Sequence, residues 1–168
     1  MKAITLWPEW AWAILHLGKQ IENRSRPLPM TMLGKPVALH AGKWIGGRPG
    51  DSAMWEGWAG LMQMAERAGW RYSYYHDNNG ILVRSFTKDG ITVQTDETPI
   101  LTSAITGVIH FDASMMPYVG DLDGWRVADQ HGWRLRTVEP LQSQISCSGA
   151  LGFWQVPTPV ESAIQMQR

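Results

Sequence analysis

The stretch Gly18-Lys19-Gln20-Ile21-Glu22-Asn23-Arg24-Ser25-Arg26 decides how the rest of this sequence is interpreted. It follows an apolar, tryptophan-rich segment from Leu6 to Leu17 and is followed closely by two prolines. Gly18 suits the left-handed position just past a helix end. The pattern therefore predicts a helix that ends before Gly18 and a short strand that starts soon after it.

Alternation along that strand sorts the charged side chains, because residues two apart share a face. We expect one face to carry Glu22, Arg24 and Arg26, and the other Ile21 and Asn23. Lys19 precedes the strand, so alternation does not fix its direction. This density of charge is unusual in a chain of which only 18% is charged.

Length and charge limit what the protein does. The 168 residues suit one domain with a substantial core. The 15 basic and 15 acidic residues balance, which argues against a broad grip on duplex DNA but leaves room for a local basic groove. The only cysteine, Cys147, excludes an intramolecular disulfide and a multi-cysteine zinc site. One cysteine also fits a reducing cytoplasm, which is the expected location.

The N-terminus imitates a secretion signal, with Lys2 followed by apolar residues as far as Leu17. Pro8, Glu9 and His16 interrupt the apolar run, and no small-x-small cleavage site follows. No run reaches the roughly 20 apolar residues that a membrane helix needs. We therefore expect neither secretion nor a membrane partner.

Periodicity and turn residues predict an alternation of short strands with two helices. In the first half we expect strands at Ala3 to Leu6 and Val37 to His40, and helices from Pro8 to about Leu17 and from Ser52 to Ala68. In the second half we expect strands at Ala104 to Asp112, Trp125 to Val127, Trp133 to Arg136 and Gly152 to Val156, with a turn at His131-Gly132. Val160 to Arg168 is a polar tail or a short helix.

The segment from Arg71 to Gln94 reads as an inserted β-arm. Strand-like runs occur at Tyr72 to Tyr75, Ile81 to Phe86 and Ile91 to Gln94. Lys88-Asp89-Gly90 between the last two is a strong hairpin signal. Its tyrosines either pack the arm or widen a binding surface.

Three pieces of the chain resemble the ASCH domain family, which belongs to the PUA-like β-barrels. The run from Ile4 to Arg24 resembles the opening of that domain, and Gly18, Lys19, Glu22 and Arg24 match its G-K-x-x-E-x-R signature in order. Ala38 to Lys43 resembles the next strand and turn, and Gly132 to Pro157 resembles the closing strands.

The resemblance implies an α+β fold, a PUA-like mixed β-barrel with flanking helices. One domain would span residues 1–157, with the inserted β-hairpin arm at about 71–95 and a C-terminal tail at 158–168.

The resemblance also implies three activities: binding of RNA or a modified nucleotide, amide hydrolysis on an N-acylated cytidine, and cleavage of RNA. The amidohydrolase type has a threonine where this chain has Glu22, with its lysine aligned to Lys19. The loss of that hydroxyl nucleophile puts the threonine mechanism in doubt here.

The side chains themselves support a polar cleft, although an ion-pair network on the surface is the alternative interpretation. Arg24 can hold a phosphate through two parallel hydrogen bonds. Glu22 can accept from an exocyclic amine or act as a base, and Lys19 can neutralise an oxyanion or act as a nucleophile or base. His40, on an apolar strand, is either a core histidine or an acid or base for RNA cleavage.

The ten tryptophans have two interpretations, as packing groups or as platforms on which a base stacks. Our first hypothesis is a binding module for single-stranded RNA or a modified nucleotide. Its ligand-binding residues would be Trp7, Trp10, Arg24, Arg26, His40 and Lys43.

The second hypothesis is an enzyme in the same cleft, an amidohydrolase or a metal-independent ribonuclease, with Lys19 and Glu22 as the catalytic pair. A third is an interaction protein with a tryptophan-rich docking surface. The histidines outside that cleft have no partner at ligand spacing, and no nucleotide-loop motif occurs, so we expect no metal and no cofactor. The glycine-rich segment from Gly46 to Gly50 is interpreted as an ordinary flexible loop, with closure over a ligand near Lys43 as the alternative.

Overall fold

The computed structural model describes residues 1–43, 52–95, 103–117 and 124–168, and the side chains of 52–56 are not described. These ranges hold nine strands, three α-helices and one 3₁₀ turn. In chain order they are β1 (Lys2–Leu6), α1 (Pro8–His16), β2 (Ile21–Arg24), η1 (Met30–Met32), β3 (Pro36–Ala41), α2 (Ser52–Arg67), β4 (Arg71–His76), β5 (Leu82–Lys88), β6 (Ile91–Thr95), β7 (Ala104–Met115), β8 (His131–Ser146), β9 (Phe153–Gln155) and α3 (Thr158–Gln165).

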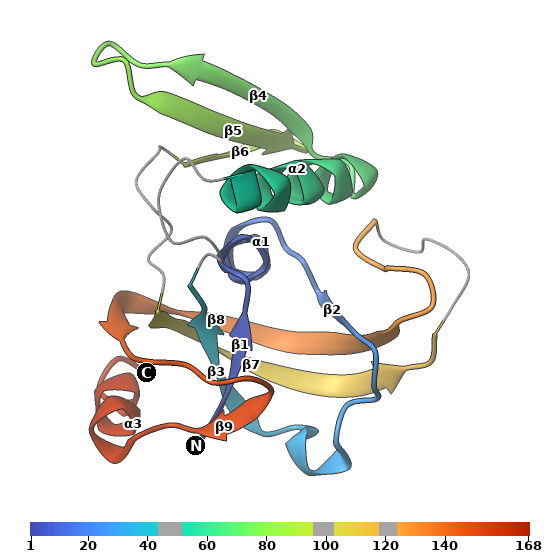
Figure 1. Ribbon diagram of the computed structural model, residues 1–168, viewed down its shortest axis with the longest axis vertical. Helices are drawn as coiled ribbons and strands as arrows, with labels where there is room; N and C mark the ends of the chain where they lie inside the picture. The colour runs from blue at the N-terminus through green and yellow to red at the C-terminus, as the bar shows by residue number, and fades with distance from the viewer. Residues whose placement is uncertain (44–51, 96–102, 118–123) are drawn as a thin grey trace.

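Six of the strands form one mixed sheet in the order β2-β8-β7-β3-β1-β9. β1 and β3 are parallel, and the other neighbours are antiparallel. The sheet curls into a half-barrel whose edges are β2 and β9 (Figure 1). The predicted α+β class is therefore confirmed, with a barrel-like sheet.

The second sheet, β4-β5-β6, lies over α2, and α2 lies over α1 (Figure 1). Trp12 of α1 joins these layers, because its ring lies 5.8 Å from that of Trp58 on α2 and 5.5 Å from that of Phe86 on β5. Asp89 and Gly90 both have positive φ, as the predicted hairpin turn between β5 and β6 requires. The three predicted strands of the arm are thus confirmed.

A separate apolar core fills the hollow of the curled sheet. It contains Leu39, Ile109 and Phe111 from the central strands. Trp133 of β8 and Phe153 of β9 stack across it, with ring centroids 5.5 Å apart and planes inclined by 7°. A third, smaller cluster includes Ile164, which anchors α3, so residues of the C-terminal segment form a short helix.

The end of α1 follows the glycine signal in the sequence. Gly18 has a φ of +66°, and the N–H of Lys19 donates to the carbonyl of Ala13 at 3.2 Å. The indole Nε1 of Trp70 donates to the carbonyl of Leu17 at 3.1 Å, which satisfies a group that a helix end leaves unpaired. The chain can therefore reverse tightly into β2.

Two expectations about the second half of the chain are wrong. Residues 125–127 form no strand, because the side-chain amide of Asn23 takes the place of a strand neighbour. It donates to the carbonyl of Trp125 at 2.7 Å and accepts from the N–H of Val127 at 3.0 Å.

His131-Gly132 is not a turn but the start of β8, a single strand of 16 residues. A Cβ at Gly132 would lie 1.9 Å from Nη1 of Arg126. The glycine is therefore required by the buried guanidinium that lies against it and not by a turn.

Glu9 is a buried acid in the first turn of α1, with only 4% of its surface exposed. Its Oε2 has no hydrogen-bond partner among the described residues. Burial raises the pKa of Glu9 from its ordinary value of 4.5 to about 7, against a smaller lowering by its own backbone N–H. Stability should consequently depend on the protonation of this side chain.

We predict that Glu9→Gln stabilises the protein above pH 7 and has little effect near pH 4. Between pH 4.5 and about 7 the native state keeps a proton that the unfolded chain releases, so the Glu9 contribution to stability falls as pH rises. The shift corresponds to at most about 3 kcal/mol. Urea unfolding of both proteins from pH 4 to 8 measures the difference.

Taking the difference isolates Glu9, because His16 and His40, whose pKa values burial lowers, are common to both proteins. Glu66→Gln, on the exposed face of α2, is the control and should show no such divergence. A constant offset between Glu9→Gln and wild type over this pH range would contradict the prediction.

Candidate binding cavity

The cavity lies at the junction of α1, β2 and the ends of β1 and β3. Its volume is about 490 Å³, which is within the usual range of small-molecule sites. The residues that line it are Thr5, Leu6, Trp7, Trp10, Lys19, Glu22, Asn23, Arg24, Gly42, Lys43, Met64, Val127, Gln130 and Leu151. They come from six separate stretches, four within the first 70 residues and two within the last 45.

Lys19 turns inward at the reversal after Gly18 and is only 2% exposed. Its ammonium donates to the carbonyl of Ile21 and to Oε2 of Glu22, the latter at 3.1 Å. It also lies 5.8 Å from the centroid of the Trp10 ring. A buried ammonium needs such partners because its desolvation would otherwise cost several kcal/mol.

Glu22 joins Lys19 to Arg24. Its Oε1 lies 3.0 Å from Nε of Arg24, although the N–H is not aimed well enough for a hydrogen bond. Arg24 donates from Nη2 to the carbonyl of Thr5 at 3.4 Å, and its guanidinium lies 5.7 Å from the centroid of Trp133. These contacts hold the guanidinium in position, while the Arg24 side chain is still 32% exposed.

Six of the eight residues expected at the site line this cavity: Trp7, Trp10, Lys19, Glu22, Arg24 and Lys43. Glu22 and Arg24 share a face of β2, as alternation requires. Arg26 does not join them, because β2 ends at Arg24 and the exposed Arg26 follows in a bend. Its carbonyl instead accepts from Nε1 of Trp133 at 2.9 Å.

His40 is buried in the sheet, 1% exposed, and is not part of the cavity wall. Its Nε2 donates to the carbonyl of Cys147 at 2.9 Å, and its ring lies edge-on to Trp154 at 5.5 Å. Burial lowers the pKa of His40, with a smaller opposing effect of the Cys147 hydrogen bond, so the neutral ring is favoured. The structure thus places His40 as a packed, hydrogen-bonded core group.

Sequence reasoning missed several residues of the wall. Thr5 and Leu6 come from the end of β1, and Met64 from α2. Val127 and Gln130 precede β8, and Leu151 precedes β9. None belongs to the G-K-x-x-E-x-R signature, so only the folded chain brings them together.

Charge at the cavity differs from that of the whole chain. Three cations, Lys19, Arg24 and Lys43, and one carboxylate, Glu22, are the ionised groups among the described lining residues. The cavity therefore has an excess of two positive charges in a protein whose net charge is zero. The rings of Trp7 and Trp10 add apolar surface beside them.

In the described ranges, no three histidine, cysteine, aspartate or glutamate side chains come close enough to hold a metal ion. None of the helices described is long and apolar enough to cross a membrane. The loop from Gly46 to Gly50, expected next to Lys43, lies outside the described residues. A scan against protein-family models and a search of curated proteins give no match to this chain.

We predict that Glu22→Gln destabilises the fold by about 3 kcal/mol, because it leaves the buried Lys19 ammonium without its counter-charge. Chemical denaturation at neutral pH measures the loss. Asp112→Asn is the matched control, since it breaks the exposed ion pair with Arg134 at 2.7 Å and should cost little. Equal effects of the two changes would show that the Lys19–Glu22 pair is not energetically distinct.

Proposed function

We propose that this protein is a nucleic-acid-related binding module that takes single-stranded RNA or one modified nucleotide in the cavity beside β2. The observation that carries the proposal is the convergence of Lys19, Glu22 and Arg24 with two tryptophans on one hollow. A phosphorylated ring compound needs these two kinds of surface, cationic groups for the phosphate and an aromatic face for the base.

The contacts suggest a role for each group. The Arg24 side chain is partly exposed and held in position by Glu22, so its guanidinium can bind a phosphate. Lys43 also lines the cavity and supplies a second cation. Trp7 is 44% exposed and offers a face for stacking. Glu22 holds Lys19 and Arg24 in place and keeps acceptor capacity for an exocyclic amine of the base.

The charge distribution favours a short anionic ligand over a long duplex. Duplex binding needs many phosphate contacts, whereas the excess positive charge here is confined to one cavity. We further propose that the half-barrel is of the PUA-like kind and that the chain is an ASCH domain. The matching signature residues Lys19, Glu22 and Arg24 stand in the cavity wall, which supports this assignment. A single cysteine supports action in the cytoplasm.

A second candidate is an enzyme in the same cavity, an amidohydrolase on N-acylated cytidine or a ribonuclease. It is favoured by one observation, a buried amine 3.1 Å from a carboxylate. Against it, the Lys19 ammonium donates to both Ile21 and Glu22, an arrangement that suits a held cation better than a free base. Binding therefore remains the first proposal.

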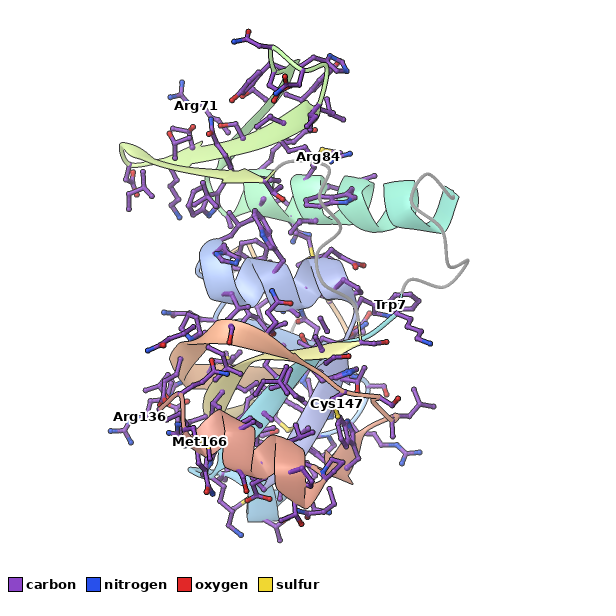
Figure 2. The ribbon with its side chains drawn as sticks, turned by 90° about the vertical axis from the view of Figure 1, so that its left-hand side faces the viewer. Trp7, Arg71, Arg84, Arg136, Cys147 and Met166 are labelled. Atoms are coloured by element: carbon purple, nitrogen blue, oxygen red, sulfur yellow. The ribbon has the colours of Figure 1, made fainter. Side chains whose placement is uncertain are left out.

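We expect Arg24→Ala to weaken binding of a short single-stranded RNA by about ten- to a hundredfold, the usual range for a lost charge-assisted hydrogen bond. Titration calorimetry measures the affinity, and its dependence on salt should also become shallower. Arg71→Ala is the control, because Arg71 is exposed on the arm, far from Trp7 (Figure 2). An Arg24→Ala variant that binds as wild type would place the ligand elsewhere.

The enzyme alternative is tested by incubating the protein with N-acetylcytidine and with single-stranded RNA while products are followed by chromatography. Under our proposal, the ligand is bound and recovered intact. Turnover by wild type that disappears in Lys19→Ala would replace the binding module with the enzyme. Turnover equal in both would exclude Lys19 as the catalytic amine.

A further inference from the structure

Leu151 is a large apolar residue that lines the cavity and yet is almost fully exposed to water. Its side chain is 98% exposed, the highest value among the large apolar side chains of the described residues. It nevertheless belongs to the wall of the cavity. A side chain in that position stands at the mouth, with its apolar surface in water until something occupies the cavity.

The first half of the loop at 147–152 is fixed to the sheet. The N–H of Cys147 donates to the carbonyl of Ser103 at 2.9 Å, and the carbonyl of Cys147 accepts from His40 at 2.9 Å. Gly149 packs so closely that a Cβ there would lie 2.3 Å from Cε1 of His40. The core histidine thus anchors the loop that carries Leu151.

The second half of the loop projects from the sheet. Residues 150–152 are all exposed, and Gly152 adopts a φ of +67° in open space just before β9. β9 pairs antiparallel with β1, with Ile4 opposite Phe153. The anchored loop therefore holds Leu151 at the same cavity that the exposed Trp7 lines.

We propose that Leu151 and Trp7 form two sides of a clamp on the planar ring of the ligand, so that Leu151 helps to select ligands that carry a base. This inference rests on the binding function proposed above and adds a specificity-determining residue to it. The cationic groups Arg24 and Lys43 bind the phosphate, and the clamp binds the ring attached to it. Inorganic phosphate should then bind without any contribution from Leu151.

The test compares two probes by titration calorimetry: the tightest-binding of the four nucleoside 5′-monophosphates, and inorganic phosphate. Half-burial of a leucine side chain corresponds to about a fivefold change in affinity. We expect Leu151→Ala to weaken nucleotide binding by about fivefold and to leave phosphate binding unchanged. Leu151→Met, of similar volume and apolar, should restore most of the loss.

Met166→Ala is the matched control, because Met166 is 87% exposed and lies on the C-terminal segment, well away from Trp7 (Figure 2). It should bind both probes as wild type does. Since Leu151 is almost fully exposed, its replacement should not change the melting temperature, and this is checked for each variant.

Two results would overturn the clamp, and they differ from failure of the function itself. If Leu151→Ala binds the nucleotide as tightly as wild type while Arg24→Ala loses it, the binding function stands and the clamp is wrong. An equal loss for phosphate and nucleotide would also overturn it, because Leu151 would then act on the whole cavity and not on the ring. If wild type binds none of these probes, the clamp is overturned, while the titration with short single-stranded RNA still decides the binding function by itself.

Discussion

The burial of the Lys19 ammonium constrains the rest of this site. A charged amine that is 2% exposed must find acceptors within the protein, and here they are the carbonyl of Ile21 and the carboxylate of Glu22. Both acceptors lie within three residues of the lysine, so the chain must bend directly after α1 and then extend. The left-handed Gly18 makes that bend without steric cost. β2 then pairs with β8 at the edge of the sheet.

Once Glu22 is fixed, alternation fixes Arg24 on the same face of β2. The carboxylate then lies between two cations, which reduces their mutual repulsion and leaves the cavity with a positive excess. Electrostatic attraction is strongest for a small anion, because only a few positive charges are gathered and the rest of the chain carries the compensating negative excess. Under the binding function that we propose, a neutral protein would in this way take a short phosphorylated ligand without a general affinity for nucleic acid.

The sequence predicted local structure correctly where neighbouring residues determine it. It did not predict structure that depends on contacts between residues far apart in the chain. Gly18 and the alternation after it predicted the reversal and the shared face of Glu22 and Arg24. The expectation that Arg26 shares this face is wrong, because alternation holds only within a strand and β2 ends at Arg24. The strand expected at 125–127 is absent because Asn23, about a hundred residues away, makes the backbone hydrogen bonds that a neighbouring strand would otherwise make. No local pattern encodes such a partner.

Trp10 explains why the cavity lies where it does. Its ring packs against both the core inside the curled sheet and the core between α1, α2 and the arm. Its contact with Lys19 places the buried charge at the junction of the two cores. The cavity lies at this junction, because Trp10 and Lys19 both line it. If the proposed clamp forms, specificity depends on the exposed side of this cavity, where Leu151 stands on an anchored loop.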